Sequence, residues 1–325
     1  MKKLLAPALL GLGLVSCGTP KATTPTTTIN GAGATFPAPL YAAWFHSLAK
    51  DHNIKVNYQS IGSGSGVRQY NAGTTDFGAS DKAISNKKIK EPVVQIPMTG
   101  GAIVPAYNLP GCEVNMSQLQ LADVFLGKIK SWKHFGCEDK PILVVHRSDG
   151  SGTTAGFTAS LSAFSPEWKE KVGAGKAVDW PTGVGSKGNE GVAATIKQQP
   201  GAIGYLNYGY VAGDKKLQQV RLENRAGKYV FANAETSSAG LSRIKLDKQL
   251  RGSDPNPKGK NSYPIVSLTW VLARPVHPRN NEMKQVFAYM LSLESQSISD
   301  RLGYVPLPEM VRQKSLEAVK GLKAE

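Results

Sequence analysis

Residues 142–154 read Ile-Leu-Val-Val-His-Arg-Ser-Asp-Gly-Ser-Gly-Thr-Thr, and this stretch decides the fold class. It starts as a short apolar run suited to a buried strand and then becomes a loop of small polar residues. The loop leads into a segment in which Phe157, Leu161 and Phe164 share one helical face. A strand, a short loop and a helix in this order predict an α/β layer structure.

Two further stretches have the same organisation. Gly31–Pro37 precedes a helical face formed by Leu40, Trp44 and Leu48, and Ile61–Gly66 follows an alternating, strand-like run. The other predicted elements are strands at residues 54–58 and 101–107 and a helix carrying Met283, Val286, Phe287 and Met290. The chain therefore alternates strands and helices along most of its length.

The three loops share a chemistry that suits a small anion. Each places Gly, Ser or Thr before a helix, where backbone N–H groups are free and the helix dipole is positive. Arg147 adds a planar, permanently charged donor for an oxyanion. One such loop alone is a common turn, and Arg147 could instead form a surface ion pair. Three similar loops favour a shared anion site.

Asp81 is the unusual member of this set. It ends the stretch Asp76-Phe-Gly-Ala-Ser-Asp81, and a carboxylate suits an anion site only when the anion carries a proton. Inorganic phosphate keeps a proton near neutral pH and sulfate does not, so a buried acceptor favours phosphate. The alternative is that Asp81 caps a turn or a helix.

Composition limits the classes of function. Hydrophobic residues form 41% of the chain, and 39 Lys and Arg against 24 Asp and Glu give a net charge of +15. This charge favours anionic partners, but the basic residues are not interleaved with aromatics as nucleic-acid binding requires. No phosphate-binding loop of NTPases, no His-Glu-x-x-His and no metal spacing of the five His occurs in the sequence. We therefore expect no nucleic acid, no metal, no cofactor and no catalytic residues.

The beginning of the chain looks like an export signal. Lys2 and Lys3 precede an apolar run over residues 4–15, which is shorter than the about 20 residues that span a bilayer. Leu14-Val-Ser-Cys17 resembles the lipobox of bacterial lipoproteins, which implies a signal peptide at residues 1–16 and lipidation of Cys17. Residues 17–28 are then a Thr-rich tether. The alternative is a plain secretory signal with an unrelated Cys.

Export also bears on the other two cysteines. Cys112 and Cys137 would reach a compartment that permits disulfides, and a bond between them would close a loop of roughly 25 residues. The alternative is two unpaired, buried thiols. We expect the disulfide.

Several motifs resemble one known family. They are Gly31-Ala-Gly-Ala-Thr-Phe-Pro-Ala-Pro-Leu-Tyr-Ala-Ala-Trp44, Asp76–Asp81, Arg147–Thr153, Trp180-Pro-Thr-Gly-Val-Gly-Ser-Lys-Gly-Asn-Glu-Gly191 and Gly201-Ala-Ile-Gly-Tyr205. Together they strongly resemble the phosphate-binding protein of bacterial phosphate ABC transporters. The resemblance runs from about Ile29 to the C-terminus and is thinnest across residues 214–260.

The resemblance implies a two-lobed periplasmic-binding-protein fold, type II-like, in which two α/β domains are joined by a hinge of two crossing strands. Lobe I would comprise residues 29–107 and 264–325, and lobe II residues 108–263, with crossings near Tyr107 and Tyr263. The implied phosphate ligands are Thr35, Phe36, Ser63, Asp81, Arg147, Ser151, Gly152 and Thr153. Asp149 would orient the arginine, and Ser65 is left unassigned because the sequence after Ser63 differs from some relatives.

The implied function is extracytoplasmic, high-affinity binding of inorganic phosphate and its delivery to an ABC transporter permease with its ATPase. The protein would be a monomeric lipoprotein without enzymatic activity, in the periplasm or at the cell surface. The alternatives are a secreted phosphatase-like enzyme, or a carrier or sensor of another protonated oxyanion. Ser63 or Ser151 could serve as the nucleophile of such an enzyme, but neither has a His at a recognisable motif position.

Overall fold

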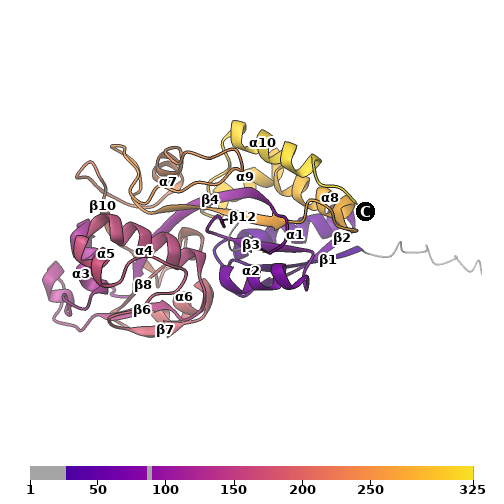
Figure 1. The fold of residues 1–325 in the computed structure, drawn as a ribbon. Coiled ribbons are helices and arrows are strands. Elements are labelled where there is room, and N and C mark those ends of the chain that lie inside the picture. The colour runs from indigo at the N-terminus through magenta and orange to yellow at the C-terminus, as the bar shows by residue number, and fades with distance from the viewer. Residues whose placement is uncertain (1–26, 86–89, 325) are drawn as a thin grey trace, which may run out of the picture.

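The computed structural model describes residues 27–85 and 90–324, which form a two-lobed α/β molecule (Figure 1). Its main sheet has the order β2-β1-β3-β12-β4-β8-β6-β7, and β9 pairs with β4. The strands are β1 (Thr27–Gly33), β2 (Ile54–Ser60), β3 (Phe77–Ser80), β4 (Val94–Tyr107), β6 (Leu143–Arg147), β7 (Val184–Ser186), β8 (Ala202–Asn207), β9 (Gln218–Gln219) and β12 (Val266–Ala273). A smaller sheet contains β5 (Asn115–Met116), β10 (Arg221–Glu223) and β11 (Tyr229–Val230).

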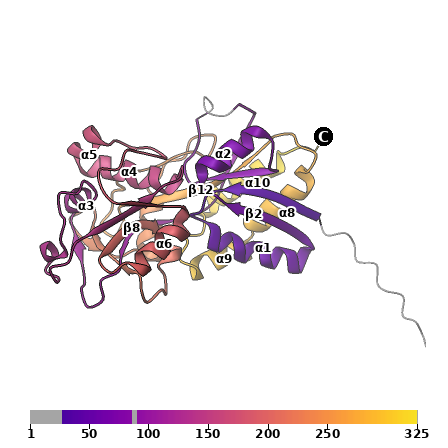
Figure 2. The ribbon, with the colours of Figure 1, turned by 90° about the horizontal axis from the view of Figure 1, so that it is seen from below.

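Helices cover the sheet in two separate groups (Figures 1 and 2). We use lobe I for the part around β1, β2 and β3, and lobe II for the part around β6, β7 and β8. The helices of lobe I are α1 (Ala38–His52), α2 (Ser63–Ala72), α8 (Asn280–Met290), α9 (Leu293–Arg301) and α10 (Glu309–Lys320). Those of lobe II are α3 (Gln118–Phe125), α4 (Gly152–Phe164), α5 (Pro166–Lys171) and α6 (Gly188–Gln198). The remaining helical segments are η2 (Trp132–Phe135), η3 (Tyr208–Tyr210) and α7 (Ala234–Leu241).

Strands β4 and β12 connect the two lobes. β4 pairs antiparallel with β12 over residues 94–102, and its remaining residues, 103–107, pair with β8 of lobe II. The Ile103 amide donates to the Ile265 carbonyl at 2.9 Å, so the two crossing segments are hydrogen-bonded where the partner changes. One long strand therefore belongs to both lobes, and Figure 1 shows it running between them.

β4 is longer than the sequence predicted. The sequence predicted a strand only from Gly101, whereas β4 begins at Val94. Pro97 lies inside this strand, and the β4–β12 register shifts opposite it, between Thr269 and Trp270. Because proline has no N–H to donate, a strand that contains one usually carries such an irregularity. The predicted residue limits of the lobes stay a prediction.

The helices read from the periodicity are present. The Leu40, Trp44 and Leu48 face belongs to α1, and all three side chains are buried. Phe157, Leu161 and Phe164 are buried on α4, and the buried face of α8 is Met283, Val286, Phe287 and Met290. These apolar faces pack on the sheet and fix the start of each helix relative to the strand before it.

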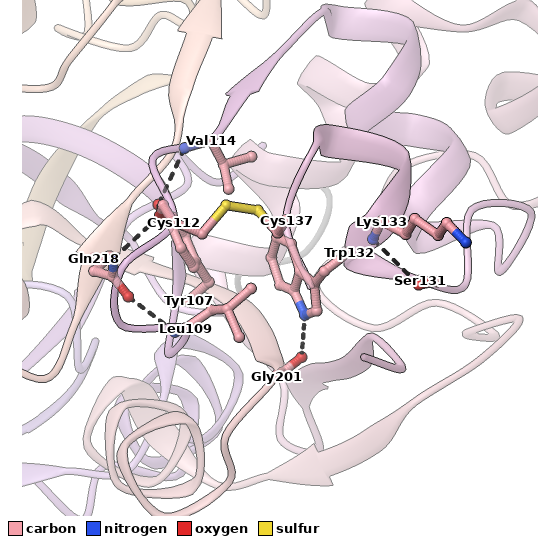
Figure 3. Close-up of a disulfide and its surroundings, with 10 residues drawn as sticks. All are labelled: Tyr107, Leu109, Cys112, Val114, Ser131, Trp132, Lys133, Cys137, Gly201 and Gln218. Carbon is pink, nitrogen blue, oxygen red and sulfur yellow. Dashed lines mark hydrogen bonds between the residues drawn. A yellow bond between two sulfur atoms is a disulfide. The ribbon is translucent and has the colours of Figure 1, made fainter. Parts of the chain in front are cut away.

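The predicted disulfide is present in lobe II. Cys112 and Cys137 are bonded, with 5.7 Å between their Cα atoms, and they join the segment after β4 to the end of η2 (Figure 3). The Tyr107 hydroxyl donates to the Cys112 carbonyl at 2.7 Å, and the Trp132 indole donates to the Gly201 carbonyl at 2.8 Å. The bond therefore secures the end of the crossing strand to the body of lobe II.

Most of the predicted N-terminal export signal and tether lies outside the described residues. This applies to the signal peptide at residues 1–16, to the lipidation site Cys17 and to the tether as far as residue 26. Thr27 and Thr28, which were also expected in the tether, already pair with Ile54 and Lys55 of β2. Among residues 27–85 and 90–324, the helices are all too short or too polar to cross a bilayer.

Candidate anion-binding site

Three helix starts define the candidate site. α1 begins at Ala38, two residues after Phe36, α2 begins at Ser63, and α4 begins at Gly152. The first turn of each helix offers amides without intrahelical partners and the positive end of a dipole. The three loops that the sequence singled out are thus the loops that precede these helices.

The loops meet where the two lobes touch. The Gly64 amide of lobe I donates to the Gly150 carbonyl of lobe II at 2.7 Å. At Gly152, a Cβ atom would lie 2.6 Å from the Ser63 hydroxyl oxygen and 2.7 Å from the Asp81 Cβ. Because such distances are far inside van der Waals contact, only glycine allows α4 to approach lobe I this closely.

Asp81 follows β3 and is surrounded by hydroxyl groups. Its side chain accepts from Thr269 at 3.0 Å, and the Ser63 and Thr153 hydroxyls each lie 3.4 Å from Oδ2. The residue is 4% exposed, and within the described part of the chain no cation lies within ion-pair distance of it. Burial raises the pKa of Asp81 to about 6, against the lowering effects of the Thr269 hydrogen bond and the charge of Arg147.

Arg147 and Asp149 form a buried pair at the end of β6. The Arg147 Nε atom donates to Oδ1 at 2.7 Å and Nη2 donates to Oδ2 at 2.5 Å, the two-pronged geometry that fixes a guanidinium plane. Their side chains are 1% and 11% exposed. Burial acts to raise the pKa of Asp149, but the hydrogen bonds and charge of Arg147 outweigh it and lower that pKa.

This pair leaves one arginine nitrogen available. Arg147 Nη1 is buried and has no hydrogen-bond partner among the described residues. A buried guanidinium N–H without a partner is costly, so an oxyanion accepted there would satisfy it. Arg147 also lies close enough to Asp81 for its charge to act on that carboxyl group.

Asn189 is a member of the site that the sequence reasoning missed. Its side-chain Nδ2 donates to the Thr35 hydroxyl at 2.7 Å and to the Thr153 hydroxyl at 3.2 Å. It is fully buried at the start of α6 and links hydroxyls from both lobes. Asn189 lies inside the family-like motif Trp180–Gly191, but in a glycine-rich loop an asparagine looks like an ordinary turn residue.

The other predicted residues lie within the same group. Ser151 is the N-cap of α4, where its hydroxyl oxygen accepts from the Thr154 amide at 2.9 Å and its own hydrogen remains a donor. Ser65, for which the sequence predicts no ligand role, accepts from the Arg68 guanidinium at 2.7 Å on the surface. The structure brings together eight of the predicted residues, and Phe36 follows the first of them in the chain: Thr35, Ser63, Asp81, Arg147, Asp149, Ser151, Gly152 and Thr153.

Comparison with known proteins gives a consistent result. The model of the PBP superfamily domain matches residues 19–294. The "Phosphate-binding protein PstS" of Pasteurella multocida is 42% identical over 311 residues, covering 90% of each chain.

Solved structures agree on the fold. A high affinity periplasmic phosphate-binding protein, PfluDING, solved with phosphate, superposes with a TM-score of 0.72 at 21% identity, covering 88% of this chain and 92% of its own. An ABC-type phosphate transport receptor from Vibrio cholerae has a TM-score of 0.57 at 18% identity, covering 86% of this chain and all of its own. On the family model and the curated relative together, the chain belongs to the PstS phosphate-binding proteins of the PBP superfamily.

Proposed function

We propose that this protein binds inorganic phosphate between its lobes and delivers it to an ABC transporter permease with its ATPase. The names of its relatives support the ligand, and the surroundings of Asp81 support it independently. In the described part of the chain, that carboxyl group is buried among hydroxyls without an ion pair, and the nearby Arg147 guanidinium has one nitrogen without a partner. A ligand that is anionic and also carries a proton can accept from the guanidinium nitrogen and donate to the carboxylate.

The groups proposed to bind phosphate are one charged side chain and several neutral hydrogen-bond donors. The guanidinium of Arg147 supplies the positive charge, and the helix starts supply amides from Phe36, Gly152 and Thr153. Ser63 and Ser151 add hydroxyl donors, as does Thr35. Phosphate has four oxygens in a tetrahedron, so donors arriving from three helix starts can reach it from several sides.

Asp81 would supply the discrimination between anions. Its carboxylate accepts the hydrogen of a protonated phosphate oxygen, whereas sulfate would present a bare anionic oxygen to it. Sites that require a ligand hydrogen reject analogues without it by roughly 10⁴–10⁵-fold. Arsenate is protonated like phosphate and is not excluded by this argument.

The enzyme alternative has no support in the family. The relatives are binding proteins and transport receptors, so the chain acts by binding and release rather than by covalent chemistry. Ser151, one of the two candidate nucleophiles, uses its oxygen to cap α4. Ser63 lies against Asp81, which is itself surrounded by hydroxyls.

We further propose that the protein works outside the cytoplasm as a monomer held by a lipid on Cys17. The lipobox-like Leu14-Val-Ser-Cys17 supports this, as does the periplasmic location named for a structural relative. Lobe I would comprise residues 29–107 and 264–325 and lobe II residues 108–263, with closure by rotation about the crossing segments. Membrane fractionation of the native protein and of Cys17→Ser tests the anchor, because equal release of both into the soluble fraction would contradict it.

Calorimetry on the exported protein, stripped of bound phosphate, tests the ligand. We expect one phosphate per chain and no detectable heat with sulfate at the same concentration. Arsenate is titrated as a second protonated oxyanion and is expected to bind. Sulfate binding as tight as phosphate binding, or no phosphate binding, would contradict the proposal.

A further inference from the structure

Lys176 of lobe II contacts lobe I beside the candidate site. It lies in the segment between α5 and β7, and its ammonium Nζ donates to the Ser80 hydroxyl oxygen at 3.2 Å. Ser80 is the last residue of β3 and immediately precedes Asp81. The contact therefore joins the two lobes one residue away from the carboxylate that is proposed to accept the phosphate proton.

The backbone around Lys176 is fixed to lobe II. The Lys176 carbonyl accepts from the amide of Ser151, the N-cap of α4, at 2.8 Å. The preceding residue, Gly175, donates its amide to the Thr158 hydroxyl on α4 at 3.1 Å. The lysine side chain thus extends from a segment bonded to the same helix start that supplies Gly152 and Thr153.

The Ser80 hydroxyl is already oriented to accept this hydrogen bond. Its side chain is buried, and its hydroxyl donates to the Lys82 carbonyl at 2.7 Å, which uses its single hydrogen. An ammonium group has donors only, so the Ser80 oxygen is the acceptor. Because the hydroxyl is oriented from within lobe I, it does not need to reorganise when Lys176 arrives.

The charge of Lys176 also reaches the site. Together with Arg147 it acts to lower the pKa of Asp81, against the effect of burial. A bound phosphate anion would experience the same positive potential. A lysine at this position therefore acts on the ligand through charge and on the lobes through its hydrogen bond.

In a second contact between the lobes, the side chain from lobe II is negatively charged. Glu190 of lobe II accepts from the Ser60 hydroxyl of lobe I at 2.7 Å. Nearby, the Tyr210 hydroxyl donates to the Thr35 carbonyl at 2.6 Å. These contacts also hold the lobes together, but the Glu190 carboxylate repels an anion and the Tyr210 hydroxyl is neutral. Of these cross-lobe contacts, the Lys176 contact is therefore the one that attracts the bound anion.

We propose that Lys176 is an affinity-determining residue that bonds to Ser80 when the lobes are closed and holds the anion in the cleft. The inference rests on the proposed phosphate function. When the lobes separate, a contact between a lobe II ammonium and a lobe I hydroxyl is lost. Lys176 should therefore slow phosphate release more than it speeds phosphate capture.

The experiment compares phosphate dissociation constants and release rates for wild type, Lys176→Met, Lys176→Arg and Ser80→Ala. Lys176→Met should weaken phosphate binding by about fivefold to tenfold, mainly through faster release, because a charge-assisted hydrogen bond is lost. Lys176→Arg, which keeps the charge, should stay within about threefold of wild type. After Ser80→Ala, the same Lys176→Met change should cost less, since the two residues share one contact.

Lys169→Met is the matched control, because Lys169 is an exposed lysine on α5 of lobe II whose side chain makes no hydrogen bond or ion pair to the described residues of lobe I. It should bind phosphate like wild type. If Lys176→Met and Lys169→Met have the same phosphate dissociation constant and release rate, this inference is wrong while the proposed function stands. If the wild type itself does not bind phosphate, the proposed function fails and this inference fails with it.

Discussion

Asp81 and Asp149 lie in the same site, one in each lobe, and their surroundings differ. Lobe II pairs Asp149 with Arg147 through two hydrogen bonds, and the pKa of Asp149 falls below its ordinary value. Lobe I surrounds Asp81 with hydroxyls, and burial raises its pKa to about 6. One carboxylate is thus held charged by a partner, and the other is buried without an ion pair to any described residue.

The difference indicates separate roles. A carboxylate with a permanent cation beside it orients that cation and contributes little to proton recognition. A buried carboxylate without such a partner favours any ligand that brings a hydrogen to it. Under the proposed function, we therefore assign general anion attraction to lobe II and discrimination among anions to lobe I.

Removing the arginine should have the largest effect. Arg147→Ala leaves Asp149 without its partner and deletes the permanent charge of the site. Truncating one member of a buried charged pair costs about 2–5 kcal/mol, so phosphate affinity should fall roughly 30-fold to several-thousand-fold. Titration of phosphate into both proteins measures this, and an unchanged dissociation constant would remove Arg147 from the site.

Lowering the pH should open the site to sulfate. Below about pH 6 the Asp81 carboxyl group carries its own proton and can donate to an anion that has none. Sulfate affinity should therefore rise about tenfold per pH unit as the pH falls from 8 toward 6. In Asp81→Asn, sulfate affinity should not change with pH. If sulfate affinity of the wild type is also independent of pH, Asp81 does not discriminate between anions by their protons.

Replacing the other carboxylate should affect all anions alike. Asp149→Asn loosens the orientation of Arg147 without altering the acceptor at Asp81. We expect phosphate and arsenate affinities to fall by about tenfold each, the loss of roughly one charged hydrogen bond. The two affinities are measured on one protein sample, and a selective loss of only one of them would contradict the division of roles.

The smallest expected effect is on the stability of the ligand-free protein. A raised pKa means that the contribution of Asp81 to stability is present below pH 3.8 and is lost as the pH rises through about 6, so at pH 7.5 its charge is destabilising. Asp149 has a lowered pKa and contributes above its unfolded-state pKa. Thermal unfolding at pH 7.5 should therefore show Asp81→Asn higher and Asp149→Asn lower than wild type, each by roughly 2–6 °C. Shifts of the same sign would contradict the comparison.

Local patterns in the sequence predicted much of this architecture. The apolar faces of α1, α4 and α8 follow a helical period, and the loops before α1, α2 and α4 are rich in small polar residues. Asp81 was recognisable because a carboxylate is unusual in an otherwise anion-binding set. The Cys112–Cys137 bond followed from the export signal and the cysteine count.

Contacts between distant segments were not predictable in this way. Asn189 bridges Thr35 and Thr153, and Lys176 contacts Ser80, only because the two lobes come together. Nothing in the immediate neighbourhood of Lys176 distinguishes it from the many other lysines of a basic chain. The early start of β4 was hidden by Pro97, since a proline argues against a central strand.

The ratio of sulfate to phosphate affinity tests the central claim most directly. It is measured in one buffer at pH 7.5 for wild type, Asp81→Asn and Asp149→Asn. Asparagine at position 81 removes the repulsion and offers an N–H to sulfate, so the ratio should rise at least about tenfold in that variant. It should stay at the wild-type value in Asp149→Asn. If the ratio for Asp81→Asn equals that of wild type, Asp81 is a structural cap and the account of selectivity is wrong.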